Sequence, residues 1–420
     1  MSEYNDIISK RRKYLAPSLS LSYAEPLHIV RGKGQYLYDS NGKKYLDAVN
    51  NIAHVGHCHP RVIEAANVQS KQLNTNTRYL HNSVLNYAQN LSQTLPDELE
   101  ICYFTNSGSE SNDLALRIAR LYSNSNESIV LSGAYHGHTS SLIDISPYKF
   151  DGPGGSGKQD FVHVIPVPDV YRGEHTLKGV KPEQYYADLI KTTITQIRQK
   201  GKRLAFFIVE PIMGCGGQII LPASFMTEAF KSVKEAGGLC IVDEVQIGFG
   251  RVGSHFWGFE MSGVIPDIIT IGKPIGNGHP LSVVITKKNI AEVFNNGMEY
   301  FNSFGGNPVS SEIGQAVLDI IKEEDLQKNA YETGTYLLTG LEDLKDKYHI
   351  IGDIRGCGLF IGIELIKNYE NMMKELSNIA SSKPNTSLDF HSSQQDFYVV
   401  GLAKKNERIG FVIEGTGTIS

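Results

Sequence analysis

Cysteine is scarce in this sequence, and long apolar runs are missing from it. The five cysteines among 420 residues are scattered and form no C-x-x-C pair. This usage is typical of reduced core thiols in a cytosolic protein. No apolar run approaches the roughly 18 residues that a membrane span needs, and the amino terminus lacks the apolar core of a secretory signal. We therefore expect a cytoplasmic protein without a membrane partner; the sequence is also compatible with a mitochondrial location.

The sequence also lacks an excess of charge. Its 40 basic and 45 acidic residues leave a net charge of −5. Such a balance argues against nucleic acid or an anionic membrane as the main partner. The length is sufficient for a large hydrophobic core and for two domains.

Glycine, in contrast, is abundant, with 41 residues that form no repeat. The glycines cluster where apolar runs end, as expected of a fold whose loops approach a ligand closely. Residues 24–50 have the pattern of short antiparallel strands, and residues 61–95 that of two helices. After these, apolar strands alternate with amphipathic helices, and the strands are expected at 101–105, 128–131, 204–209, 239–242 and 268–271. This alternation predicts an α/β fold with a mostly parallel sheet covered on both faces.

Polar or aromatic groups follow each of these five strands. Because ligands bind beyond the carboxyl ends of the strands in such sheets, we expect a ligand site at this edge. The segments that would form it are Asn106–Glu110, Tyr135–His138, Glu210–Pro211, Asp243–Gln246 and Lys273.

Lys273 follows the buried run Ile268–Ile271 and precedes a loop rich in proline and glycine. The ordinary interpretation of a lysine at a strand end is a surface residue. The alternative is a lysine that holds an aldehyde cofactor as a Schiff base, which requires a desolvated amine on a rigid backbone. This stretch by itself does not decide between the two.

The other strand ends favour the second interpretation. Ser107, Gly108 and Ser109 open a helix, and a helix amino terminus with free N–H groups is a phosphate site, although a plainly capped helix has the same pattern. Asp243 would be a buried carboxylate in need of a cation, such as a protonated pyridine nitrogen. Tyr135 offers a ring for stacking. With Gln246 as a hydrogen-bond donor to a ring oxygen and Lys273 as a Schiff base, this order of groups predicts pyridoxal 5'-phosphate.

Two further motifs are interpreted differently. His54, His57 and His59 suggest a metal site, but Gly56 and Pro60 break any element that would direct all three to one centre, so a loop lining a pocket is the better interpretation.

Residues 152–158 nearly match the spacing of a phosphate-binding P-loop. However, Gln159 stands where serine or threonine must reach magnesium, and no core strand precedes the segment. We interpret it as a glycine-rich loop.

With these motifs, the sequence resembles the class-III aminotransferases, a branch of the fold-type I pyridoxal-phosphate enzymes. The resemblance runs from about residue 25 to about 367 and includes the motifs at 107–110, 135–137, 243–251 and 272–278. Within the family, the motifs at 50–60, 145–150 and 352–356 resemble the branch that contains ethanolamine-phosphate and 5-phosphohydroxylysine phospho-lyases and alanine–glyoxylate aminotransferase 2-like proteins.

The resemblance implies a seven-stranded large domain at residues 56–305 and a smaller α+β domain made of residues 1–55 and 306–420. It also implies a homodimer with shared active sites and a small-molecule amine as substrate. Lys273 and Asp243 would be catalytic, and Ser303 would reach the phosphate of the neighbouring subunit's cofactor. The cofactor-binding set implied is Ser107, Gly108, Ser109, Tyr135, His136, Glu210, Asp243, Gln246, Lys273 and Ser303.

Two departures from the family pattern concern Ser111, where alanine is usual, and residues 370–420, which are atypical and rich in serine, asparagine and glutamine. The sequence is compatible with three functions. The first is a phospho-lyase that releases phosphate, ammonia and an aldehyde from a phosphorylated amine such as phosphoethanolamine. The second is an aminotransferase that uses a keto acid such as pyruvate or glyoxylate. The third is a catalytically impaired homologue.

Overall fold

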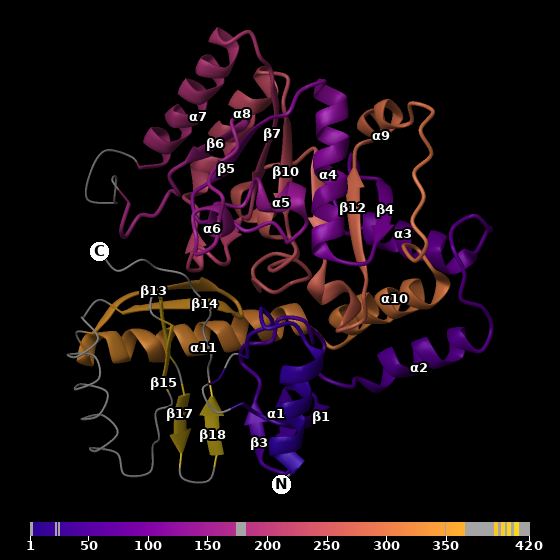
Figure 1. The fold of residues 1–420 in the computed structure, drawn as a ribbon, viewed down its shortest axis with the longest axis vertical. Coiled ribbons are helices and arrows are strands. Elements are labelled where there is room, and N and C mark those ends of the chain that lie inside the picture. Colours follow the sequence, from indigo (N-terminus) through magenta and orange to yellow (C-terminus); the bar gives the residue numbers. More distant parts are fainter. Residues whose placement is uncertain are drawn as a thin grey trace.

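The computed structural model describes residues 3–21, 23, 26–173, 182–348 and 350–365, and the backbone of four short strands between 390 and 410. Its centre is a seven-stranded sheet with the order β4-β12-β11-β10-β7-β5-β6 (Figure 1). The strands are β4 (Ile101–Thr105), β5 (Glu127–Leu131), β6 (Val162–Ile165), β7 (Leu204–Val209), β10 (Leu239–Asp243), β11 (Ile268–Ile271) and β12 (Ser282–Thr286).

Six of these strands run in one direction, and β12 runs antiparallel to both β11 and β4. The mostly parallel, seven-stranded α/β fold is confirmed. All five strands expected from apolar runs are present. The structure adds β6 and β12, whose positions the apolar runs had not indicated.

Helices cover both faces of the sheet because successive strand residues point to opposite sides. Val209 belongs to one buried cluster with residues of α3 (Asn82–Ser92), α7 (Pro182–Gln199), α8 (Ala223–Glu235) and α10 (Pro308–Glu323). Its neighbour Ile208 belongs to a second cluster with residues of α4 (Gly108–Ser123) and α9 (Lys288–Phe294). The core is therefore two apolar layers separated by the sheet.

The N-terminal strands, α11 (Leu326–Lys347), β13 (Ile351–Cys357) and β14 (Phe360–Leu365) lie below the sheet in the view of Figure 1. The N-terminal strands β1 (Ile29–Lys33), β2 (Tyr36–Asp39) and β3 (Lys44–Leu46) form the antiparallel sheet expected for this region. Also present are α1 (Glu3–Tyr14), α2 (Pro60–Ser70), α5 (Ser140–Ile143), α6 (Pro147–Phe150), β8 (Ile212–Met213) and β9 (Ile219–Ile220). The domain boundaries given above stay a prediction.

Within the atypical segment 370–420, the described backbone forms two antiparallel pairs. β15 (Phe390–Ser393) pairs with β16 (Asp396–Val399), and β17 (Gly401–Lys404) pairs with β18 (Glu407–Gly410). The rest of that segment lies outside the described residues.

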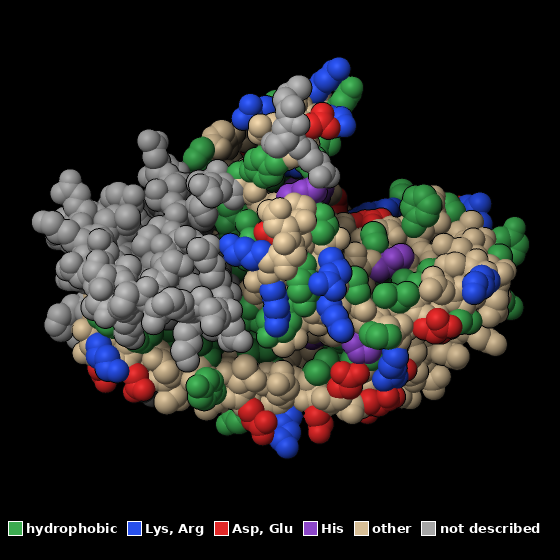
Figure 2. Space-filling model, turned by 90° about the horizontal axis from the view of Figure 1, so that it is seen from below, with side chains coloured by type: hydrophobic (Ala, Val, Ile, Leu, Met, Phe, Trp, Pro, Cys, Tyr) green, Lys and Arg blue, Asp and Glu red, His purple; other side chains and the backbone are tan. Residues whose placement is uncertain are grey.

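The molecular face in Figure 2 carries acidic and basic side chains mixed together, with hydrophobic side chains scattered between them. Charge of one sign does not dominate the described part of this face.

Candidate active site at the carboxyl ends of the strands

The strand ends that carry polar groups converge at one edge of the sheet. Val209 pairs with Val242, so Glu210 and Asp243 follow at the same level of neighbouring strands. Asp243 in turn pairs with Thr270, three residues before Lys273. Because β4 and β5 run in the same direction, their following residues emerge at this edge too. The sheet therefore gathers the predicted segments from five places in the sequence.

Asp243 is a buried carboxylate with an ordered set of donors. Its Oδ2 accepts from Asn112 Nδ2 at 2.8 Å and lies 2.9 Å from His136 Nδ1. Its Oδ1 accepts from the backbone N–H of Val245 at 3.1 Å. Asn112 is itself fixed, because its Oδ1 accepts from Thr270 Oγ1 at 2.6 Å. The position of Asp243 is therefore set by α4, β11 and the loop after β5.

His136 is the protein's own partner for Asp243. A carboxylate only accepts, so the hydrogen between them sits on His136 Nδ1. The His136 backbone is held as well, since its N–H donates to Ser146 Oγ at 3.0 Å and its carbonyl accepts from Asn112 at 2.7 Å. Its Nε2 is buried and has no hydrogen-bond partner among the described residues. An unpaired buried ring nitrogen beside a carboxylate indicates a site shaped for a group other than the protein itself.

Two further carboxyl groups flank Asp243. Burial raises the pKa of Glu210 to about 7, against a lowering by His136. Burial raises the pKa of Glu244 to about 8, although the backbone N–H groups of Gly258 and Phe259 lower it. Glu210 accepts from Tyr135 N at 3.2 Å and from Gly214 N at 3.0 Å. Such clustered, shifted carboxyl groups are a mark of functional sites.

The amino terminus of α4 forms the adjoining part of the site. Ser107 caps the helix, since its Oγ accepts from Glu110 N at 3.2 Å. The reciprocal half of a capping box, in which the N3 carboxylate accepts from the N-cap backbone, is shifted by one residue. The Glu110 carboxylate accepts from Asn106 N at 2.8 Å instead of from Ser107. Ser109 Oγ accepts from His138 N at 3.2 Å, which ties this turn to the loop after β5.

Glycines keep this turn close to the neighbouring strands. A Cβ at Gly108 would lie 2.7 Å from Val245 Cγ1, and a Cβ at Gly272 would lie 3.2 Å from the Gly108 Cα. The residue before Lys273 and the start of α4 are thus packed backbone against backbone. Gly108 therefore allows this close approach because it has no side chain.

Tyr135 stands on the loop after β5 and is half-buried. Its ring meets Tyr148 edge-on, with ring centroids 5.7 Å apart. The Lys149 ammonium lies 5.6 Å from the Tyr135 ring centroid and 5.0 Å from that of Tyr148. Among the described residues, Lys149 has no carboxylate partner. A ring and a free cation therefore stand together at this edge.

Lys273 begins the short 3₁₀ turn Lys273–Gly276 directly after β11. Its φ is +27°, an unusual value for a residue with a side chain. The side chain is half-buried and makes no hydrogen bond or ion pair to any described residue. Strain of this kind is retained where the surrounding structure over-determines it, and it is concentrated at functional sites. The surface interpretation of Lys273 fits this backbone less well than the Schiff-base interpretation.

Gln246 is held by a residue far away in the sequence. Its Oε1 accepts from Asn51 Nδ2 at 3.0 Å. Asn51 belongs to the loop with three histidines, and these do not share a centre. His54 meets Phe249 O and Arg251, His57 meets Asp47, and His59 caps α2. The described residues contain no group of three or more metal-ligating side chains.

Ser303 is exposed and makes no hydrogen bond to the other predicted site residues in the described chain. Its neighbour Asn302 donates to Glu110, at the amino terminus of α4. Ser111, the departure from the usual alanine, is fully buried. Its hydroxyl lies between Thr105 Oγ1, 2.7 Å away, and Ser282 Oγ. The extra hydroxyl is therefore satisfied inside the core.

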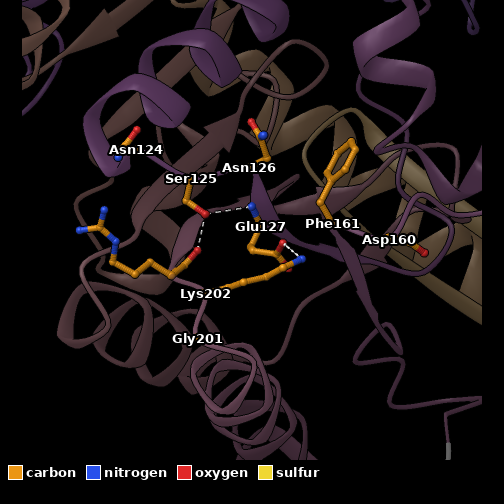
Figure 3. Close-up of a pocket in the computed structure, with 9 residues that line it drawn as sticks. Asn124, Ser125, Asn126, Glu127, Asp160, Phe161, Gly201 and Lys202 are labelled. Carbon is orange, nitrogen blue, oxygen red and sulfur yellow. Dashed lines mark hydrogen bonds and ion pairs between the residues drawn. The ribbon is translucent and has the colours of Figure 1, made fainter.

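The P-loop-like segment 152–158 follows the short helix α6 and leads to β6, so it lacks the strand–loop–helix context of a P-loop. A cavity of about 520 Å³ lies at the opposite, amino-terminal edge of the sheet, between residues 124–127, 160–161 and 201–203 (Figure 3). Glu127 at its wall is bound by Lys202 at 2.6 Å and by His163 at 2.7 Å.

Sequence reasoning missed Asn112, Glu244 and Asn51. Only Asn112 carried a usable signal. It occupies the face of α4 that also carries the buried Ala115, Leu116 and Ala119, and a polar residue at such a position needs a partner.

These residues fit pyridoxal phosphate on structural grounds. A buried carboxylate is available for a cationic ring nitrogen, and a glycine-containing helix start with two hydroxyl groups is available for a phosphate. The sequence pattern of the family described as "Aminotransferase class-III" matches residues 20–387.

The chain belongs to the class-III aminotransferase family. It is 46% identical over 401 residues to a Drosophila melanogaster protein named "Alanine–glyoxylate aminotransferase 2-like", covering 90% of this chain and 81% of the relative. It is 40% identical to "Ethanolamine-phosphate phospho-lyase homolog 1" of Caenorhabditis elegans, covering 86% and 80%. A solved phospholyase from Arthrobacter in complex with phosphoethanolamine matches with a TM-score of 0.82 and 37% identity, covering 86% and 85%.

As a class-III aminotransferase family member, the protein is an enzyme that uses pyridoxal phosphate and acts on a small amine. The resemblance and the cofactor expected from the sequence are confirmed. No helix in the described part of the chain is long and apolar enough to span a membrane.

Proposed function

We propose that this class-III family member is a phospho-lyase that eliminates phosphate from a phosphorylated amine such as phosphoethanolamine. The observation that carries the proposal is the similarity to the solved Arthrobacter phospholyase over most of both chains. The site adds support, because Lys149 has an ammonium group beside Tyr135 and no carboxylate partner among the described residues. This ammonium is available to pair with the phosphate of a phosphorylated substrate.

In this proposal, Lys273 holds the cofactor covalently through Nζ, and Asp243 pairs with its ring nitrogen. Ser107, Gly108 and Ser109 bind the cofactor phosphate, and Tyr135 covers the ring. His136 and Glu210 fix Asp243 and Tyr135 through the contacts described above. Gln246 donates a hydrogen bond to the ring oxygen.

Pyridoxal phosphate, when bound, supplies an electron sink for the carbon that carries the substrate nitrogen. Once the substrate amine has displaced Lys273 from the cofactor, the free Lys273 Nζ would take the proton from that carbon. The C–O bond of the neighbouring carbon would then break, and phosphate would leave with the electron pair. Water then completes the conversion to aldehyde and ammonia. Asp243 is a fixed, buried carboxyl group, and it would provide the charge that favours this step.

The test is phosphate release from phosphoethanolamine by the purified enzyme loaded with pyridoxal phosphate, without any keto acid. Phosphate, acetaldehyde and ammonia in equal amounts are expected. A strict requirement for a keto acid would contradict the proposal.

The second candidate is an aminotransferase, favoured by the name of the Drosophila relative. It would use the same residues and differ in where the proton returns, so the two reactions are separated only by their products. Transfer of the amino group to pyruvate or glyoxylate would identify it. A catalytically impaired homologue is the third candidate, and the intact Lys273 and Asp243 count against it.

We also propose a homodimer in which Ser303 reaches the cofactor of the other subunit. In support, an apolar hollow of about 330 Å³ is lined by residues that include Tyr79, Leu80 and Tyr300. Leu80 is 98% exposed in the single chain, and Phe304 is 71% exposed.

Sedimentation at micromolar concentration tests the dimer. Leu80→Asp is expected to yield monomers without activity, whereas Tyr336→Asp, at an 82% exposed position on α11, is expected to stay dimeric. A wild-type monomer with full activity would overturn the shared site. A cytoplasmic location is likewise proposed, with the scattered cysteines as its support, and fractionation of the source cells would test it.

A further inference from the structure

The loop at residues 50–59 carries the three histidines. It is hydrogen-bonded both to the segment after Asp243 and to the segment after Lys273. Asn51 Nδ2 donates to Gln246 Oε1 at 3.0 Å, and His54 Nε2 lies 2.7 Å from Phe249 O. On its other side, the Val55 N–H donates to Asn277 Oδ1 at 2.9 Å. Asn277 is the C-cap of the 3₁₀ turn Lys273–Gly276. The loop therefore joins the segment after Asp243 to the segment after Lys273.

The contacts of His54 fix the hydrogens in this loop. Phe249 O can only accept, so His54 Nε2 carries the hydrogen and Nδ1 accepts from Arg251 Nη2 at 2.9 Å. Burial and the Arg251 charge lower the pKa of His54 to about 3, so it remains neutral at physiological pH. The loop is held in one arrangement of donors and acceptors.

The two ends of the Gln246 amide have different surroundings. Its oxygen is occupied by Asn51, and its nitrogen lies against Gly214, where a Cβ would be only 2.2 Å away. The Gln246 nitrogen makes no hydrogen bond to any described residue. An amide can present either its donor or its acceptor by turning over, and the atom that a neighbour occupies decides which one is left. Here Asn51 takes the oxygen and leaves both N–H groups for a ligand.

We propose that Asn51 is a positioning residue that orients the Gln246 amide so that it donates to the ring oxygen of pyridoxal phosphate. The proposal rests on the role proposed above for Gln246 but not on which of the two reactions the enzyme performs. It also gives the histidine loop a function, which is to carry Asn51 to the site and to tie it to the loop of Lys273.

The decisive variant is Asn51→Asp. Aspartate has the same shape but only accepts, so Gln246 must turn its N–H groups toward residue 51 and its oxygen toward the cofactor. Asn50→Asp is the matched control. It adds the same charge one residue away at an exposed position and keeps the acceptor that binds the Ile52 N–H at 3.1 Å.

The first readout is the dissociation constant of pyridoxal phosphate, titrated into cofactor-free enzyme. Asn51→Asp is expected to raise it about 10- to 100-fold, as for loss of a hydrogen bond to a charged group. Asn50→Asp is expected to stay within about 2-fold of wild type. The second readout is the visible absorption of the bound cofactor against pH, whose midpoint is expected to rise in Asn51→Asp because a stabilising donor is withdrawn.

Equal affinities and equal midpoints in the two variants would overturn the proposal. Thermal melts of both cofactor-free proteins show whether Asn51→Asp folds. If it does not, Asn51→Ala replaces it, with an expected weakening of about 2- to 10-fold, and a wild-type affinity there overturns the proposal as well. Wild-type enzyme that binds pyridoxal phosphate without releasing phosphate would reject the phospho-lyase function and leave this test unaffected.

Discussion

Two buried carboxylate–histidine pairs lie at opposite edges of the same sheet. Glu127 opens β5 at the amino-terminal edge and meets His163, while Asp243 closes β10 at the carboxyl edge and meets His136. Burial alone raises the pKa of Glu127, but hydrogen bonds and charge from Lys202 and His163 outweigh it, and the net pKa is lowered. Glu127 is a paired, structural carboxylate.

The Asp243 pair has a different environment. No lysine or arginine among the described residues forms an ion pair with it, and its nearest acidic neighbours, Glu210 and Glu244, have raised pKa values. Its partner His136 leaves Nε2 unpaired, and Glu244 leaves Oε2 unpaired. A histidine–carboxylate contact therefore does not mark a site by itself. The absence of a lysine or arginine partner among the described residues does mark one. Buried acidic groups without a protein cation are tolerated where a ligand supplies the positive charge.

The largest difference is expected between two lysines, one at each edge. Lys273→Ala should lower turnover about 10⁴-fold, because it removes both the covalent attachment and the proton acceptor. Lys202→Ala should change turnover by no more than about 2-fold. The assay is steady-state turnover in whichever of the two reactions the wild type performs. Similar losses in both variants would erase the distinction between the edges.

The two carboxylates come next. Asp243→Asn should lower turnover about 10²- to 10³-fold by removing a fixed charge. Glu127→Gln should leave turnover unchanged and lower the free energy of unfolding by about 1–3 kcal/mol, since Lys202 loses a charged partner but is 48% exposed. Turnover and denaturant unfolding of both variants are the measurements. An active Asp243→Asn enzyme would refute the assignment of this edge.

The pH dependence of stability should have opposite signs at the two edges. The folded-state pKa of Glu244 is raised to about 8, so the folded protein binds the extra proton and its stability falls as pH rises toward 8. In cofactor-free wild type, the free energy of unfolding should fall by on the order of 2 kcal/mol between pH 5.5 and 8 because of Glu244. Glu244→Gln should not show this fall.

Glu127 has a lowered pKa, so its contribution is present at neutral pH and disappears as pH falls through the folded-state pKa. The stability deficit of Glu127→Gln should therefore shrink in acid. Denaturant unfolding of wild type and both variants from pH 8 down to about pH 3 is the measurement, and parallel curves for all three would contradict the prediction.

The smallest effect is expected for the histidines. His136→Gln should lower turnover about 10-fold, because Asp243 loses one of its donors but keeps Asn112 and the Val245 N–H. His163→Gln should leave turnover within about 2-fold of wild type. Rescue of most activity by His136→Asn, whose Nδ2 takes the place of the His136 Nδ1 donor, would show that hydrogen bonding to Asp243 is what matters. Equal turnover in His136→Gln and wild type would remove His136 from the site.

Local patterns were sufficient to predict the strand ends. The apolar runs before Asn106, Tyr135, Glu210, Asp243 and Lys273 each form a strand, and parallel strands must bring their carboxyl ends to one edge. The same logic could not place β6 or β12. His163 interrupts the apolar run of β6, and the antiparallel direction of β12 follows from how the chain returns between β4 and β11.

By itself, the sequence determined the fold class, the edge at which the site lies and the residue types that suit pyridoxal phosphate, because periodicity and chain order act over short distances. Only the tertiary structure decided which groups meet there. Asn51 reaches Gln246 across 195 positions, and His136 reaches Asp243 across 107. Burial, which raises the pKa of Glu210 and Glu244, likewise depends on what packs around each carboxyl group. No local pattern carries that information.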